Sequence, residues 1–81
     1  MSNADLKSFL LRALHRKSPA TEESLITAAK NVFLDECASS DVTSALRGLD
    51  DSGFITTQFS DGITPTTCAL TAKGQHKAKT L

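Results

Sequence analysis

The stretch from Ser39 to Ile55 constrains the fold most, because one periodicity of apolar residues ends there and another begins. Its first part repeats apolar residues at the spacing of one helix face: Val42, Ala45, Leu46 and Leu49. Ser39 or Ser40 can cap the start of this helix, and Gly53 can adopt the left-handed conformation that ends it. The next residues alternate between the two sides of a β-strand, one of which holds Ile55, Thr57 and Phe59. We therefore expect a helix over about residues 40–52 that passes directly into a strand.

Two further helices are predicted upstream. Ser2 and Asp5 can cap a helix over about residues 4–16, whose apolar face holds Leu6, Phe9, Leu10, Ala13 and Leu14. Thr21 can cap a second helix over about residues 22–33, whose inner face holds Leu25, Ala28, Ala29 and Val32. Leu11 widens the apolar face of the first helix beyond what the other elements are expected to cover.

The residues after the first strand predict a β-hairpin over residues 54–70. Asp61-Gly62 is a two-residue turn signal, because Asp and Gly tolerate the positive φ angles of a type I′ turn. This turn would pair Ile55 with Cys68. Pro65 lacks the N–H group that a strand interior needs, so we expect the hairpin to lie at the edge of its sheet.

A short final helix is expected over about residues 72–80. Thr71 can cap it, but its apolar stripe consists only of Ala78 and Leu81, so it should fray unless another element packs on it. A chain of 81 residues has room for one hydrophobic core. The prediction is one α+β domain, 1–81, with a three-helix core, a C-terminal hairpin and a short last helix. Its core is expected to contain Leu10, Leu14, Leu25, Ala29, Val32, Leu46, Leu49, Ile55 and Leu70.

Several classes of protein are disfavoured. The chain has no apolar run long enough for a membrane span and no secretory signal, so we expect a cytoplasmic protein that does not enter membranes. Cys37 and Cys68 are expected to be buried reduced thiols, although the sequence leaves a bridge open. A zinc site would have to draw His15 and His76 to them without any local ligand pair, so we predict no metal. Without a catalytic motif or a phosphate-binding loop, we predict neither a cofactor nor an enzyme.

Two parts of the sequence resemble the winged helix-turn-helix family. The first is the Ser/Thr-rich helix start with Ala45-Leu46, Leu49 and the Gly53-Phe54-Ile55 exit, and the second is Leu70-Thr71-x-x-Gly74 after the hairpin. The resemblance covers roughly residues 21–75 and is to bacterial regulators of the MarR and PadR kind. It implies a winged-helix fold in which the helix over 40–52 enters the major groove and the hairpin is the wing. It also implies double-stranded DNA as partner and a role as a transcriptional regulator or a phage- or plasmid-type control protein.

The family pattern, carried over residue by residue, gives DNA-binding candidates on the helix over 40–52: Ser39, Ser40, Thr43, Ser44 and Arg47. Arg47 is the expected base reader, since a guanidinium fits guanine O6 and N7; the alternative is an intrahelical pair with Asp51. Lys73 and Lys77 of the last helix are expected to meet phosphates, or else to complement the helix dipole.

The charge pattern supports an alternative function. Residues 18–71 hold two basic and eight acidic side chains, and Gly48 stands where such helices often carry a basic residue. A winged helix that binds protein rather than DNA therefore remains the second hypothesis. We also expect a homodimer through the terminal helices, which would cover Leu11 and the thin last helix.

Overall fold

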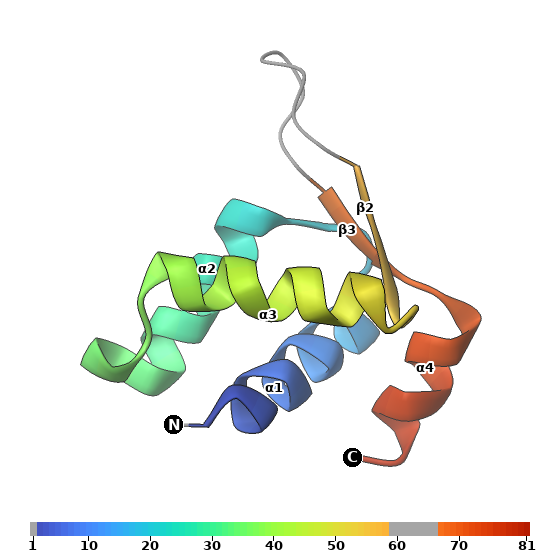
Figure 1. The fold of residues 1–81 in the computed structure, drawn as a ribbon, viewed down its shortest axis with the longest axis horizontal. Coiled ribbons are helices and arrows are strands. Elements are labelled where there is room, and N and C mark those ends of the chain that lie inside the picture. Colours follow the sequence, from blue (N-terminus) through green and yellow to red (C-terminus); the bar gives the residue numbers. More distant parts are fainter. Residues whose placement is uncertain (1, 59–66) are drawn as a thin grey trace.

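The computed structural model describes residues 2–58 and 67–81. In this part of the chain it has four α-helices, one 3₁₀ turn and a three-stranded antiparallel sheet, which make a small α+β fold. Figure 1 shows the elements in chain order: α1 (Asn3–Arg16), β1 (Ala20–Thr21), α2 (Glu22–Phe33), η1 (Leu34–Glu36), α3 (Ser39–Asp51), β2 (Ile55–Gln58), β3 (Thr67–Leu70) and α4 (Ala72–Lys79). Each α-helix begins and ends within one residue of its predicted range. None of the described helices combines the length and the apolar character needed to cross a bilayer.

The predicted caps of the first two helices are present, whereas that of α3 is wrong. Ser2 Oγ accepts the Asp5 N–H at 3.1 Å, and Thr21 Oγ1 accepts the Ser24 N–H at 3.1 Å. The N-cap of α3 is Ala38, which has no hydroxyl, and the Asp41 carboxylate instead accepts the Ala38 N–H at 3.0 Å. The hydroxyls of the first turn of α3 are therefore not used in capping that helix.

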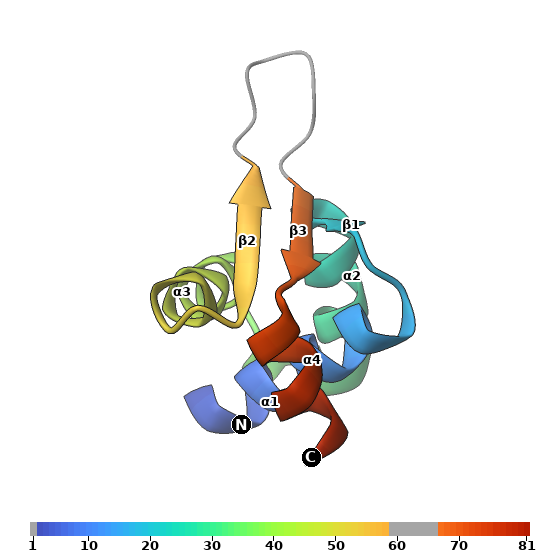
Figure 2. The same cartoon turned by 90° about the vertical axis from the view of Figure 1, so that its right-hand side faces the viewer.

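The sheet has the order β1-β3-β2, which corrects the prediction of an edge hairpin (Figure 2). β3 is the central strand, because Ala20 of β1 pairs with Cys68 on its other side. The Leu70 N–H donates to Ser18 Oγ at 3.2 Å and extends this contact by two residues. β1 is only two residues long, too short to show a strand periodicity in the sequence.

The hairpin register differs from the predicted one by two residues. Ile55 pairs with Leu70 and Thr57 with Cys68, whereas the predicted turn would have paired Ile55 with Cys68. Asp61-Gly62 and Pro65 lie outside the described residues. Because side chains alternate with a period of two, the shift leaves each residue on its predicted face, and Ile55 and Cys68 are both buried in the core.

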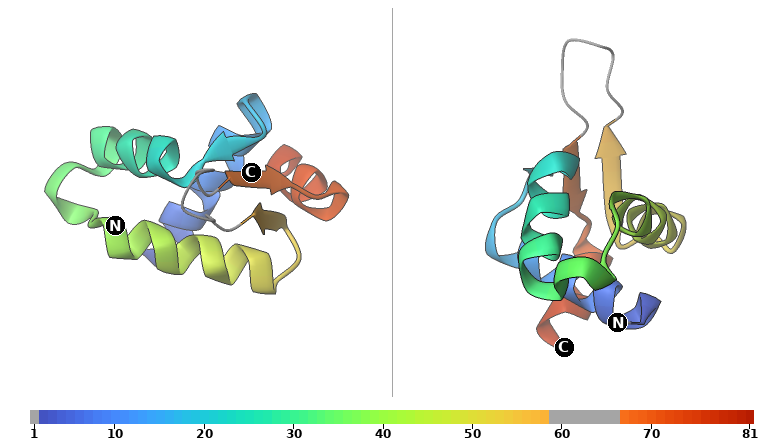
Figure 3. Two further views of the ribbon diagram at one scale, coloured as in Figure 1. Left: turned by 90° about the horizontal axis from the view of Figure 1, so that it is seen from above. Right: turned by 90° about the vertical axis from the view of Figure 1, so that its left-hand side faces the viewer.

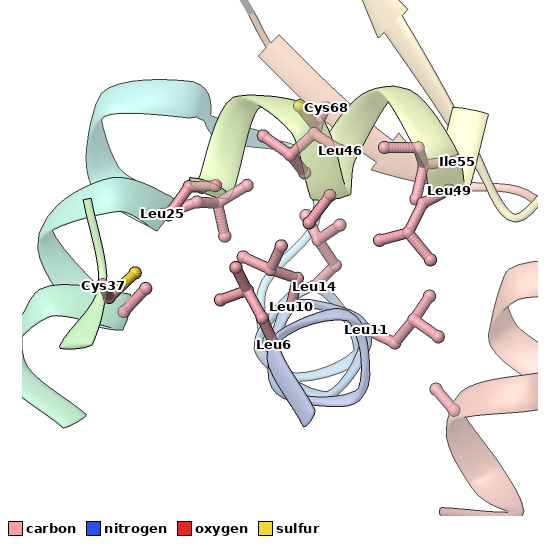
Figure 4. Packing of buried hydrophobic residues seen from close by; sticks show 14 residues of the cluster. Leu6, Leu10, Leu11, Leu14, Leu25, Cys37, Leu46, Leu49, Ile55 and Cys68 are labelled. Atoms are coloured by element: carbon pink, nitrogen blue, oxygen red, sulfur yellow. The ribbon is translucent and has the colours of Figure 1, made fainter. Parts of the chain in front are cut away.

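The core forms where α1 crosses beneath α2 and α3 (Figure 3). Leucines from these helices meet under the sheet (Figure 4). The prediction that Val32 lies in this core is wrong, since its side chain is 58% exposed. Phe33 takes the inward position instead and stacks edge-on against Phe9, with 5.6 Å between the ring centroids.

The terminal helices cover each other within one chain. Leu11 is only 3% exposed and points toward α4 (Figure 4), and Ala78 of α4 is also buried. The expectation that Leu11 is left uncovered is therefore wrong, and α4 has the packing partner that its thin apolar stripe requires. The prediction of a homodimer through these helices was based on apolar surface that is in fact covered within one chain.

Candidate nucleic-acid interface

The C-terminal end of α3 closes in a tight turn. Gly53 has a positive φ of 82°, which a glycine adopts without strain. Its N–H donates to the Asp50 carbonyl at 3.0 Å, and the Phe54 N–H donates to the Leu49 carbonyl at 2.9 Å. These two bonds form a Schellman motif, so the helix stops at this glycine and the chain turns directly into β2.

The Leu70-Thr71-x-x-Gly74 segment fastens α4 to this turn. Thr71 Oγ1 donates to the Gly53 carbonyl at 2.6 Å and accepts the Gly74 N–H at 3.1 Å, and the Thr71 N–H donates to the Phe54 carbonyl at 3.0 Å. A Cβ atom on Gly74 would overlap the Phe54 carbonyl oxygen. Thr71 therefore supplies the hydrogen bonds of the contact, and Gly74 supplies the space for it.

Lys73 belongs to the same contact. Its ammonium group donates to the Ser52 carbonyl at 2.7 Å and lies 4.9 Å from the centroid of the Phe54 ring. The cation thus satisfies a free carbonyl at the end of α3 and lies over an aromatic face. We call the set Gly53, Phe54, Thr71, Lys73 and Gly74 the α3–α4 junction.

The structure does not bring Lys73 and Lys77 together with the serines of α3. Ser39 and Ser40 begin α3, whereas Lys73 contacts the residue just after its other end (Figure 1). A helix of 13 residues is roughly 20 Å long. Lys77 is exposed on α4, on the same side of the molecule as the junction. The seven candidate residues therefore fall into two separate groups.

The outer face of α3 carries the other candidates. Ser39, Ser40, Ser44 and Arg47 are exposed. In the part of the chain that the structure describes, Arg47 makes no ion pair with Asp51, the alternative that the sequence left open. Thr43 differs from the others, because it is half-buried and its hydroxyl donates to Glu22 Oε1 of α2 at 2.7 Å. Its hydroxyl therefore ties α2 to α3.

A small pocket lies beside Arg47, between α3, the start of α2 and the sheet. Its volume is about 110 Å³ and its lining consists of Glu22, Thr43, Leu46, Arg47, Asp50, Thr57 and Cys68. Pockets that enclose small-molecule ligands usually have volumes of about 300 Å³ or more. The pocket beside Arg47 is therefore too small for a nucleotide or a similar cofactor.

Sequence reasoning missed Lys7 of α1. Its ammonium group lies where a side chain of residue 48 would be, since a Cβ atom on Gly48 would be 2.8 Å from Lys7 Nζ. Lys7 is far from α3 in the sequence, and a lysine on an amphipathic helix is normally a solvated charge. Only the crossing of α1 and α3 brings this cation to α3.

Carboxylates share this surface with the cations. Asp41, Asp50 and Asp51 are all exposed on α3. Asp41 is engaged by the Ala38 N–H, whereas Asp50 and Asp51 occupy the last turn. The outer face thus carries hydroxyls in the first half of α3, Arg47 and the end of Lys7 in the second half, and two carboxylates at its C-terminal end.

The cysteines and the acidic residues suggest no chemistry at this surface. Cys37 and Cys68 are free and buried, and burial, the largest cause, raises the pKa of both thiols. A raised pKa keeps a thiol protonated and unreactive near neutral pH. Among the described residues, no three His, Cys, Asp or Glu side chains gather as a metal site would require.

Comparisons with protein-family models, with curated proteins and with solved structures give no match for this chain.

Proposed function

We propose that this chain is a winged helix-turn-helix protein that binds duplex DNA through the outer face of α3. The order of its elements supports the fold: a helix, a short strand, two helices joined by a tight turn, and then two strands that pair with each other. The two strands that follow α3 in the chain, β2 and β3, are neighbours in the sheet, whose strand order is β1-β3-β2. In this proposal α3 is the recognition helix and the hairpin is the wing.

The observation that carries the DNA-binding proposal is the composition of the outer face of α3. Ser40 and Ser44 expose hydroxyls in the first half of the helix, and Arg47 in its second half exposes a guanidinium that no described side chain neutralises. Hydroxyls and cations are the groups that bind phosphates and base edges. Helix-turn-helix proteins place the N-terminal residues of the recognition helix against the bases, which is where the two serines lie. We assign base contacts to Arg47 as well, because its planar guanidinium matches guanine O6 and N7, and leave Asp50 and Asp51 outside the groove.

The proposal assigns no phosphate contact to Lys73, because its ammonium group is bound within the junction. The DNA-binding unit is one chain, since α1 and α4 already cover the apolar residues that a terminal-helix dimer would bury. We place this function in the cytoplasm, where the two free thiols stay reduced. Its biological role would be control of transcription, without catalysis.

A titration of fluorescent random-sequence duplex with the protein tests the proposal. Binding measured by anisotropy should weaken steeply as salt rises, because each phosphate contact releases counterions. The slope of log affinity against log salt should be about −0.9 for each phosphate contact. Absence of binding at low salt would overturn the DNA-binding function.

A second candidate function is docking to another protein. The specific observation is an apolar pair at the end of α2, where Val32 is 58% and Leu34 is 70% exposed. Leu34 also has a positive φ of 55°, which a non-glycine residue adopts at a cost of about 1–3 kcal/mol. The backbone of Leu34 ends α2, where its N–H donates to the Lys30 carbonyl, whereas its side chain remains exposed. If the duplex does not bind, this end of the molecule is the next surface to test by substitution.

A further inference from the structure

The side chain of Lys7 crosses from α1 to α3 and ends at Gly48. A Cβ atom on Gly48 would lie 2.8 Å from Lys7 Nζ and 2.9 Å from Lys7 Cε. The end of the lysine side chain, rather than its stem, therefore lies against α3. Gly48 leaves the space that this contact needs, although a glycine within a helix costs about 1 kcal/mol relative to alanine.

No described residue satisfies this ammonium group. Lys7 has neither a hydrogen bond nor an ion pair in the part of the chain that the structure describes. The carboxylates of α3 do not pair with it, including Asp51, which follows Gly48 by one helical turn. Lys73 provides the contrast, since its ammonium group donates to a carbonyl at the end of the same helix. Lys7 is half-buried and lies against the helix, yet its charge has no partner among residues 2–58 and 67–81.

The position of Lys7 complements that of Arg47. Residues 47 and 48 are consecutive in α3, so their side-chain directions differ by about 100° around the helix. Arg47 lines the pocket on the side of α2 and the sheet, whereas Lys7 arrives from α1 (Figure 1). The two cations therefore flank the outer face of α3 on opposite sides.

We infer that Lys7 is a phosphate-binding residue, which supplies from α1 the positive charge that α3 lacks at position 48. This inference rests on the proposed DNA-binding function and adds to it a contact outside the helix-turn-helix. A helix in the major groove has a DNA strand on each side, at a groove width of about 12 Å. Lysine acts as a point charge toward phosphate and needs no fixed orientation. Lys7 is thus suited to hold the strand on the α1 side while Arg47 faces the bases.

The test removes the cation from α1 and then introduces one on α3 at the point that it reached. Four proteins are titrated with random-sequence duplex over a series of salt concentrations: wild type, Lys7→Ala, Arg12→Ala, and the double variant of Lys7→Ala with Gly48→Lys. Arg12 is the matched control, because it is an exposed cation of the same helix. Thermal unfolding of each variant shows that the compared proteins are folded.

Lys7→Ala should make the salt slope less steep by about 0.9 and weaken binding several-fold at low salt, whereas Arg12→Ala should leave the slope unchanged. The double variant should restore the slope, because Gly48→Lys places a cation at the same point of α3. Equal slopes for wild type and Lys7→Ala would overturn the inference and leave the DNA-binding function intact. A reduced slope that the double variant does not restore would also overturn it. If wild type binds no duplex, the proposed function fails, and the role of Lys7 fails with it.

Discussion

The C-terminal end of α3 and its outer face use similar residues for different purposes. At the C-terminal end, Thr71 and Lys73 direct their hydroxyl and ammonium groups to carbonyls of the two residues that follow the helix. On the outer face, Ser40 exposes its hydroxyl, and Lys7 brings to Gly48 an ammonium group without a partner among the described residues. The difference shows that a hydroxyl or a cation cannot be assigned to binding from its residue type alone. The C-terminal end holds the helix in place, and the outer face leaves polar groups available to a ligand.

The largest expected effect is on the free energy of unfolding. It should differ strongly between two consecutive residues of α3, one on the buried side and one on the outer face. Leu46→Ala should lower the free energy of unfolding by about 2–5 kcal/mol, because it truncates a core side chain. Arg47→Ala should change it by less than about 0.5 kcal/mol, since its side chain is exposed. Urea denaturation measures both values. A loss below about 1 kcal/mol for Leu46→Ala would show that the inner face of α3 is wrongly assigned.

Replacing either of two helical glycines by alanine should change the stability of the protein, but with opposite sign. Gly74→Ala should destabilise the protein by about 1–3 kcal/mol, because its Cβ would meet the Phe54 carbonyl and force α4 away from the junction. Gly48→Ala should stabilise it by up to about 1 kcal/mol, because only the flexible end of Lys7 has to move. Chemical denaturation of the two variants side by side tests this contrast. Equal effects would argue against a close contact at the junction.

A smaller difference in the free energy of unfolding is expected between two hydroxyls, one that contacts the C-terminal end of α3 and one in its first turn. Thr71→Ala removes a cap of α4 and the bond to Gly53, and should cost about 0.5–2 kcal/mol. Ser40→Ala should be close to neutral, because the cap of α3 comes from Asp41. Thermal unfolding of the two alanine variants provides the comparison. A large loss for Ser40→Ala would mean that its hydroxyl has a structural role.

A still smaller effect concerns the buried thiol of Cys68, in β3, and its response to pH. Burial raises the pKa of the Cys68 thiol above its ordinary value of 9.0, so the folded chain keeps this proton at a pH where the unfolded chain releases it. The stabilisation is complete below the ordinary pKa and declines as pH rises above about 9. Unfolding free energies at pH 7 and pH 9.5 should therefore differ less in Cys68→Ala than in wild type. Equal differences in both proteins would contradict the raised pKa.

The sequence predicted the helices well because their limits depend on neighbouring residues. Ser2 and Asp5 cap α1, and Thr21 caps α2, within a single turn of chain. Gly53 ends α3 through bonds to residues just before it. These signals are local, and they require no knowledge of the tertiary structure.

Errors occurred where a residue's role depends on a distant partner. β1 exists because Ala20 pairs with Cys68, and Leu11 is covered because α4 packs on α1. The charge of Lys73 predicts a phosphate contact or a helix-dipole role, but its position beside the Ser52 carbonyl depends on how α4 packs. The position of Lys7 has a similar origin, since only the helix crossing takes its side chain to Gly48. The limits of the helix that carries the candidate site are therefore predictable from the sequence, whereas the contacts of these lysines are not.

The most direct test of this account compares two cations near α3 in one duplex-binding experiment. Arg47→Ala and Lys73→Ala are titrated with random-sequence duplex at low salt beside wild type, and each variant is checked for folding by thermal unfolding. We expect wild type to bind, Arg47→Ala to bind several-fold more weakly, and Lys73→Ala to bind like wild type although it is less stable. Equal loss of binding in both variants would contradict the division of α3 into a structural C-terminal end and a binding outer face. Absence of binding by wild type would contradict the DNA-binding function itself.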